Sequence, residues 1–169
     1  KEEILALEQV RLDAADGTLD DLVWLTSFVT EQGTKGAINV RSVVVRVDDA
    51  WLDDAVAEAT LVLDCTDNFV TRQAINRACV AHAKPLVSGA AIRMDGQLAV
   101  FDLRAADSPC YACVYGDGTD GDLACSEAGI LGPVVGVVGT LQALAAIRTL
   151  SGAAVASVWV LYTSDAADE

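Results

Sequence analysis

One junction between an apolar run and a polar cluster constrains this chain more than any other feature. Residues 61–72 read LVLDCTDNFVTR, an apolar-rich run that ends in an aspartate and is followed at once by polar side chains. The pattern predicts a strand over Thr60–Asp64, a helix over Asn68–Ala83 and, after a proline, a strand over Leu86–Ser88. A strand, a helix and a strand with short joints form a unit whose two strands run parallel. Ligands of such sheets bind where strands end and helices begin, which places the predicted site at this junction.

The pattern that follows adds an antiparallel hairpin to the parallel sheet. Ala90–Met94 and Gln97–Leu103 flank Asp95-Gly96, a dipeptide typical of two-residue hairpin turns. We therefore predict an α/β fold with a Rossmann-like, mostly parallel sheet and an added antiparallel hairpin.

Two short amphipathic helices are expected within residues 1–37, the first marked by Leu5, Leu7, Val10 and Leu12 and the second by Leu19, Leu22, Trp24, Leu25 and Val29. A strand over Ser42–Val47 and a helix over Trp51–Glu58, capped by Asp48 and Asp49, are expected next. After the hairpin we expect a loop over Ser108–Glu127, a long helix over Ala128–Leu150 that stops at Gly152, and a strand over Ser157–Tyr162.

The composition limits the classes of partner. The chain has 169 residues and a formal net charge of −14, which repels nucleic acid and anionic membrane surfaces. We therefore expect neither nucleic acid nor a membrane as a partner. Hydrophobic residues make up 53% with few aromatics, so the core is expected to be aliphatic, as in buried parallel strands.

One stretch has the length of a membrane span. Residues 128–147 carry no charge, and twenty residues are enough to cross a bilayer. Four glycines, a proline, a threonine and a glutamine dilute the hydrophobicity of this stretch and favour a buried helix instead. The first ten residues, KEEILALEQV, lack the apolar centre of a signal peptide, so we expect a cytoplasmic protein.

Asp67 and Asn68 are the candidate ligand-binding residues of the junction. Both residue types cap helix N-termini, so one interpretation is purely structural. In the other, the helix start binds phosphate and Asp67 holds Mg²⁺ between phosphate oxygens; the two interpretations are compatible. Asp64 adds a second carboxylate, although an aspartate at a strand end often only bonds the next loop. The basic residues expected near the turn are Arg72, Arg77 and Arg93. Each can neutralise phosphate charge, although solvated or ion-paired surface roles are more common for arginine.

The five cysteines favour reduced thiols, with or without a metal, over a disulfide framework. Cys110 and Cys113 have a spacing at which two thiolates share one tetrahedral zinc ion, and a redox pair is the alternative. Cys125 stands just before the long helix, whose dipole favours a thiolate. It is therefore a candidate nucleophile, a possible third zinc ligand, or an ordinary half-buried cysteine. Structural roles are expected for Cys65 and Cys79, in packing, and for His82, as a helix cap.

Taken in order, these motifs resemble one protein family. The run VLDCTDNFVTRQAINRACVAHAKPLVSGAAIRMDGQLAVFD is followed by SPCYACV and then by CSEAGILGPVVGVVGTLQALAAIRTLSG. Together they resemble MoeB, ThiF and HesA, the bacterial relatives of ubiquitin-activating enzymes, and within that family the MoeB-type molybdopterin-synthase adenylyltransferases. The resemblance covers about residues 38–152. It implies an adenylyltransferase domain over residues 38–162, between an unassigned helical segment (1–37) and a tail (163–169) that do not match.

The resemblance implies an enzyme that uses ATP and Mg²⁺. Such enzymes adenylate the C-terminal glycine carboxylate of a ubiquitin-like sulfur-carrier protein, in molybdenum-cofactor or thiamine biosynthesis. Asp67 and Asn68 match the positions that contact magnesium and ATP, and Arg72 is the basic residue that we expect to bind the nucleotide beside them.

The resemblance also assigns roles to the cysteines and to the long helix. Cys110 and Cys113 match the first half of the family's structural zinc site. Cys125 matches a position that forms a thiol-linked intermediate in some members and is dispensable in others. The helix from Ile130 matches a region of the family's homodimer, so a homodimer is implied.

The chain departs from the family pattern at both ends. The family opens with a strand and a GxGGxG turn, followed by an acidic ribose ligand and phosphate-binding arginine and lysine residues, and a second CxxC pair is expected toward the C-terminus. None of these is present here. The resemblance therefore implies a partial domain, a truncated copy that we expect to be inactive by itself. A non-catalytic partner-binding module is the alternative function, while a nicotinamide dehydrogenase would need a glycine fingerprint that the chain lacks.

Overall fold

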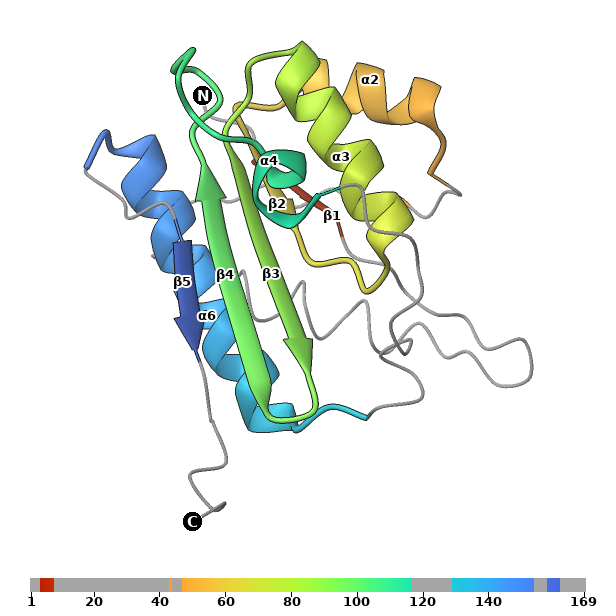
Figure 1. Cartoon of the computed structure of the whole chain (residues 1–169). Coiled ribbons are helices and arrows are strands. Elements are labelled where there is room, and N and C mark those ends of the chain that lie inside the picture. The colour runs from red at the N-terminus through yellow and green to blue at the C-terminus, as the bar shows by residue number, and fades with distance from the viewer. Residues whose placement is uncertain (1–3, 8–42, 44–46, 117–128, 154–157, 162–169) are drawn as a thin grey trace. The chain divides into compact units, whose positions relative to one another are not determined.

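A computed structural model describes residues 4–7, 43, 47–116, 129–153 and 158–161, and within them the chain forms a five-stranded sheet of order β1-β2-β3-β4-β5. β1 pairs parallel with β2 and β2 parallel with β3, whereas β4 is antiparallel to both β3 and β5 (Figure 1). β4 is thus the one strand of the five that runs in the opposite direction, which confirms the mostly parallel α/β sheet with an added hairpin. The strands are β1 (Ile4–Leu7), β2 (Leu61–Asp64), β3 (Leu86–Ile92), β4 (Asp95–Phe101) and β5 (Val158–Leu161).

The helices begin and end close to the predicted positions. The Asp48 side chain accepts a hydrogen bond from the Trp51 backbone N–H at 2.8 Å, and Asn68 caps the next helix in the same way. Gly152, with φ of +72°, follows the last helix as the predicted stop, a backbone conformation that glycine adopts readily. The helices are α2 (Asp49–Glu58), α3 (Phe69–Ala81), α4 (Tyr111–Tyr115) and α6 (Gly132–Leu150). The short α4 lies within the segment predicted as loop, and that part of the prediction is wrong.

The strands direct alternate side chains into two separate cores. Val62 and Leu86 pack into one core, and their neighbours Leu61 and Val87 pack into the other. This period of two is expected for a sheet that is covered on both faces. Side chains of α2, α3 and α4 complete the first core and side chains of α6 complete the second, so the sheet lies between two helical layers (Figure 1).

The hairpin is confirmed, but its turn is not at Asp95-Gly96. β3 continues through Gly89, and Ile92 pairs with Asp95, so the turn consists of Arg93 and Met94. Arg93 has φ of +53°, which is uncommon for a residue with a side chain. Its backbone N–H donates to the Gly129 carbonyl at 2.9 Å, and its carbonyl accepts from the Leu131 N–H at 2.8 Å. These two bonds to the start of α6 offset the strain and move the turn, because local turn chemistry is weaker than two tertiary hydrogen bonds.

The helix predicted around Leu5 and Leu7 is wrong for the four residues described there. Ile4–Leu7 form β1, whose residues pair in register with Leu61–Asp64. A short apolar run fits a strand and a helix equally well by periodicity, and pairing with β2 decides between them. The remainder of the two helices predicted within residues 1–37 lies outside the described residues. So does most of the strand predicted over Ser42–Val47, of which only Val43 and Val47 are described, and neither lies in a strand.

The long helix α6 packs one side against the sheet and exposes the other. Val134, Val138 and Ala145 are buried, whereas Leu144 and Ile147 are exposed. By length and composition α6 is able to cross a membrane, the one such helix within the part of the chain that the structure describes. The predicted buried helix is therefore confirmed for its sheet-facing side only.

Candidate functional site

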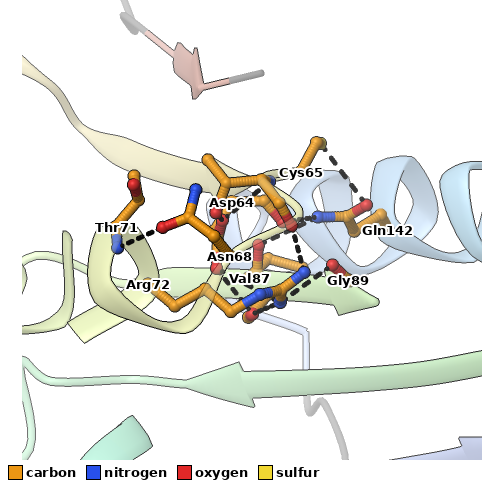
Figure 2. Close-up of polar contacts among 10 residues, drawn as sticks. Asp64, Cys65, Asn68, Thr71, Arg72, Val87, Gly89 and Gln142 are labelled. Carbon is orange, nitrogen blue, oxygen red and sulfur yellow. Dashed lines mark hydrogen bonds and ion pairs between the residues drawn. The ribbon is translucent and has the colours of Figure 1, made fainter. Parts of the chain in front are cut away.

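Asp64, the last residue of β2, is a buried carboxylate with every oxygen engaged. Its Oδ1 accepts hydrogen bonds from the Thr66 backbone N–H (3.0 Å) and hydroxyl (2.7 Å), and its Oδ2 accepts one from the Ser88 hydroxyl (2.8 Å). The Arg72 guanidinium lies 3.5 Å from Oδ2, and the residue is 0% exposed (Figure 2). Asp64 therefore stabilises the strand end and the following turn, which is the structural interpretation of this residue.

Arg72 reaches from the N-terminal part of α3 to the turn after β2 and to the middle of β3. Its Nη1 donates to the Ser88 hydroxyl (3.2 Å) and to the Gly89 carbonyl (3.1 Å), and its Nη2 donates to the Thr66 carbonyl. A buried guanidinium needs such partners, because an unpaired charge in the interior is costly. Arg72 lies beside the predicted site, and its contact with a nucleotide stays a prediction.

Gln142, on α6, is a buried polar residue that the sequence interpretation gave no role. Its Nε2 donates to the backbone carbonyls of Asp64 (2.8 Å) and Val87 (3.1 Å), and its Oε1 accepts from the Cys65 thiol at 3.6 Å (Figure 2). The signal available in the sequence is a single amide within the apolar stripe of a helix, a position where an unpaired polar group would be costly. Gln142 thereby joins the end of β2 and the neighbouring part of β3 to the helical layer formed by α6.

Asp67 and Asn68, in the turn between β2 and α3, differ in exposure and in hydrogen bonding. The Asn68 Oδ1 accepts from the Thr71 backbone N–H at 2.8 Å, so Asn68 caps α3 as one interpretation predicted. Asp67 is exposed, and within the described residues its carboxylate has no hydrogen-bond or ion-pair partner. Asp67 is therefore the carboxylate of this turn that is available to a ligand.

Cys110 and Cys113 lie together at the start of α4, with their sulfurs 3.4 Å apart and no disulfide between them. The Asn76 side chain of α3 donates to the Cys110 sulfur (3.6 Å) and accepts from the Tyr111 N–H (2.9 Å). Burial raises the pKa of the Cys110 thiol, but hydrogen bonds from Cys113 and from Asn76 lower it to a greater extent, so its pKa lies below the ordinary value. Within the described residues, no group of three His, Cys, Asp or Glu side chains surrounds a common point. The pair therefore offers two metal ligands, and further ligands would have to come from elsewhere.

The remaining residues singled out in the sequence are a buried cysteine, two surface residues, and a cysteine that lies outside the described residues. Cys79 is buried in the first core, and burial, followed by the nearby Asp64 charge, raises the pKa of its thiol to about 12. His82 follows α3 as its C-cap and lies 2.7 Å from Asp53 of α2. Arg77 forms an exposed pair with Asp49 at 3.7 Å. Cys125, the candidate nucleophile, lies outside the described residues.

Comparison with known protein families matches residues 32–166 to the ThiF family. The chain belongs to that family. The match to the ThiF family covers most of the chain and includes all of the site residues discussed above. The membership agrees with the α/β fold and with the position of the polar cluster at the carboxyl end of β2, beside Ser88 of β3.

Curated relatives within the ThiF family carry adenylyltransferase names. The chain is 47% identical over 115 residues to the molybdopterin-synthase adenylyltransferase of Escherichia coli strain K12, a match that covers 68% of this chain and 46% of that protein. It is 48% identical over 115 residues to the sulfur carrier protein ThiS adenylyltransferase of the same organism, covering 68% and 45%. It is also 40% identical over 150 residues to the adenylyltransferase and sulfurtransferase uba4 of Pyricularia oryzae, covering 84% and 28%. The chain thus spans about half or less of the length of these relatives.

Proposed function

We propose that this chain provides part of the site at which a ubiquitin-like sulfur-carrier protein is adenylated by ATP. The proposal extends to this chain the activity named for its relatives, which include adenylyltransferases of molybdopterin synthase and of the sulfur carrier ThiS. In that reaction the C-terminal carboxylate of the carrier attacks the α-phosphorus of ATP, a carboxyl–phosphate bond forms, and pyrophosphate leaves.

The observation that carries the proposal is the contrast between Asp64 and Asp67. The two carboxylates are three residues apart, yet Asp64 is buried with four partners and Asp67 is exposed with none within the described residues. A structural role alone would require only Asp64 and the Asn68 cap. The exposed carboxylate beside the α3 N-terminus is an oxygen ligand suited to Mg²⁺, next to backbone N–H groups suited to phosphate.

The site residues supply the electrostatics that such a reaction needs. Two anions, the attacking carboxylate and the triphosphate, must approach each other, and positive charge has to offset their repulsion. Mg²⁺, when bound, would neutralise phosphate charge and stabilise the leaving pyrophosphate. Asp67 would hold that ion, Asn68 would fix the helix start, and Asp64 and Arg72 would hold the turn from beneath.

We propose a structural zinc site at Cys110 and Cys113. Their sulfurs are 3.4 Å apart, close enough for one ion about 2.3 Å from each to bind both. The pair supplies half of a tetrahedral set. We further propose Cys125 as a thiol nucleophile that forms a thiol-linked intermediate, on the basis of the family resemblance.

The 169 residues contain no GxGGxG turn, so we propose that the chain alone has no adenylation activity. The test is pyrophosphate exchange into ATP with a sulfur carrier, measured on this chain and on its fusion to an N-terminal segment that carries a GxGGxG turn. The fusion is expected to exchange, and Asp67→Ala in the fusion is expected to reduce exchange on the order of 100-fold or more. No exchange by the fusion, or exchange unaffected by Asp67→Ala, would overturn the proposal.

We propose that the exposed side of α6 forms a homodimer interface. Val135, Leu144 and Ile147 are exposed apolar side chains along this helix, which favours contact with another apolar surface. Light scattering after gel filtration is expected to give the mass of two chains, and Ile147→Asp to give that of one. A monomeric wild-type chain, or a chain that floats with liposomes, would contradict this interface.

A further inference from the structure

We propose that Gln142 is a positioning residue that fixes the turn carrying Asp67 from the opposite side of the sheet. The inference rests on the proposed function in one respect, namely that Asp67 binds a divalent cation. It assigns a role in the site to α6, the helix farthest in sequence from the polar cluster.

The first part of the argument is the point at which the strands separate. The parallel pairing of β2 and β3 ends at Asp64 opposite Ser88. Asp64 is the last residue of β2 in this pairing, and Val87 belongs to the preceding pair, opposite Leu63. Gln142 Nε2 donates to the carbonyls of Asp64 and Val87, one on each strand, at 2.8 and 3.1 Å. Its carboxamide thus stands between the two strands where their own pairing stops.

The second part of the argument is the contact between Gln142 and the turn that follows β2. Its Oε1 accepts from the thiol of Cys65, the first residue after β2. The side chain therefore contacts the last residue of the strand and the first residue of the turn, with both its donor and its acceptor in use. Gln142 is 4% exposed, so no water competes for these groups.

The third part is the matching contact from the other helical layer. Arg72 of α3 donates to the Thr66 carbonyl, and Thr66 in turn donates twice to Asp64. Gln142 and Arg72 therefore hold consecutive parts of one turn from two faces of the sheet (Figure 2). Asp67 follows directly and is exposed, between Thr66, which Arg72 contacts, and Asn68, which caps α3.

The fourth part is the shape of the space around the carboxamide. A Cβ built on Gly89 would lie 2.4 Å from Gln142 Oε1 and 2.6 Å from Cδ, so glycine is required there for the glutamine to reach the strands. Leucine at position 142 would remove the Nε2 donor from both carbonyls, and glutamate would direct oxygen toward carbonyl oxygens. Among side chains of this length, the amide alone satisfies both strands and the thiol.

The test compares Gln142→Leu with Thr149→Val in the 169-residue chain. Thr149 is also a buried polar residue of α6, but its hydroxyl donates to Ala145 within the same helix, so it controls for general destabilisation. Amide hydrogen exchange is expected to accelerate at least tenfold over residues 65–68 in Gln142→Leu and to stay unchanged there in Thr149→Val.

A second measurement uses Mn²⁺ alone as the probe of the cation site. Paramagnetic broadening of the Asp67 and Asn68 amide signals is expected in the wild-type chain, to be lost in Asp67→Asn, and to require at least fivefold more Mn²⁺ in Gln142→Leu. If Gln142→Leu does not fold, Gly89→Ala displaces the same carboxamide from the strand side and is expected to give the same two changes.

The outcomes separate this inference from the proposed function. Faster exchange over residues 65–68 with no broadening in the wild-type chain would support the role of Gln142 in holding the turn but overturn cation binding by Asp67. Exchange over residues 65–68 in Gln142→Leu that matches that of Thr149→Val, with broadening at the same Mn²⁺ concentration as in the wild-type chain, would overturn the positioning role, whatever Asp67 binds.

Discussion

Gly89 of β3 and Gln142 of α6 are complementary in shape, because the glutamine carboxamide fills the volume that a side chain at position 89 would take. A Cβ at Gly89 would lie 2.4 Å from Gln142 Oε1, well inside van der Waals contact. Gly89 looks like a strand terminator in the sequence, yet β3 continues through it. The residue is glycine because another side chain approaches its backbone, and no turn is present there.

Gly89→Ala is expected to lower the free energy of unfolding by about 1–3 kcal/mol, the range for overpacking a buried site. The added methyl displaces an amide that has three hydrogen-bond partners, so the loss has a polar as well as a steric part. Urea denaturation of the two proteins measures it. The matched control is Gly136→Ala on α6, where a Cβ meets nothing within 4 Å and helix propensity is expected to raise stability by about 0.5–1 kcal/mol. Equal effects of the two substitutions would contradict the close contact.

Asp64→Asn and Asp67→Asn are expected to have opposite consequences. Asp64→Asn leaves the Arg72 charge buried without its carboxylate and is expected to cost about 3–5 kcal/mol of stability. Asp67→Asn removes an exposed charge and is expected to change stability by no more than about 0.5 kcal/mol. Urea denaturation distinguishes the two, and a destabilised Asp67→Asn would indicate that Asp67 has a structural partner.

Stability is expected to decrease with pH above about 9 because of Cys79. The pKa of this thiol is about 12 in the folded chain and ordinarily 9.0, so the folded state retains a proton that the unfolded state releases. The stabilisation is complete below pH 9 and is lost as the pH rises toward 12, with a slope approaching about 1.4 kcal/mol per pH unit. Urea denaturation at pH 8 and pH 10 measures the decrease, and Cys79→Ala is expected to show a smaller one. Equal decreases would show that Cys79 is not the group responsible.

The same pKa predicts the order in which the thiols react. At pH 8, roughly one Cys79 thiol in ten thousand is ionised, and only the thiolate is nucleophilic. Alkylation with iodoacetamide, located by peptide mass spectrometry, is expected to modify Cys110 and Cys113 well before Cys79. Rapid modification of Cys79 in the folded chain would mean that its burial is incorrect.

Cobalt binding tests the proposed zinc half-site. Co²⁺ is expected to give a thiolate-to-metal absorption band with the wild-type chain that is abolished by Cys113→Ser and unaffected by Cys65→Ser. A band that persists in Cys113→Ser would assign the metal to other thiols. A decrease in Cys125→Ser would identify the third ligand.

Local patterns predicted the centre of the fold well. The strand, helix and strand around Asn68 follow from apolar runs, a cap and a proline, all of which act within a few residues. The turn at Arg93 was missed because its backbone bonds reach Gly129 and Leu131, more than 35 positions along the chain. The strand at Ile4–Leu7 was missed because its partner begins at Leu61, and four apolar residues alone do not specify a helix or a strand.

The sequence by itself determined the α/β class, the family and the residue types of the candidate site, because strand period, helix caps and motif spacing are local properties. Only the tertiary structure decided that Asp64 is buried while Asp67 is exposed, since the two differ in the partners that fold onto them. It also decided the role of Gln142, which lies 78 residues from Asp64 and donates to that residue's carbonyl. A hydrogen bond between the sheet and the helical layer depends on where α6 packs against the sheet. No local sequence pattern around Asp64 or Gln142 contains that information.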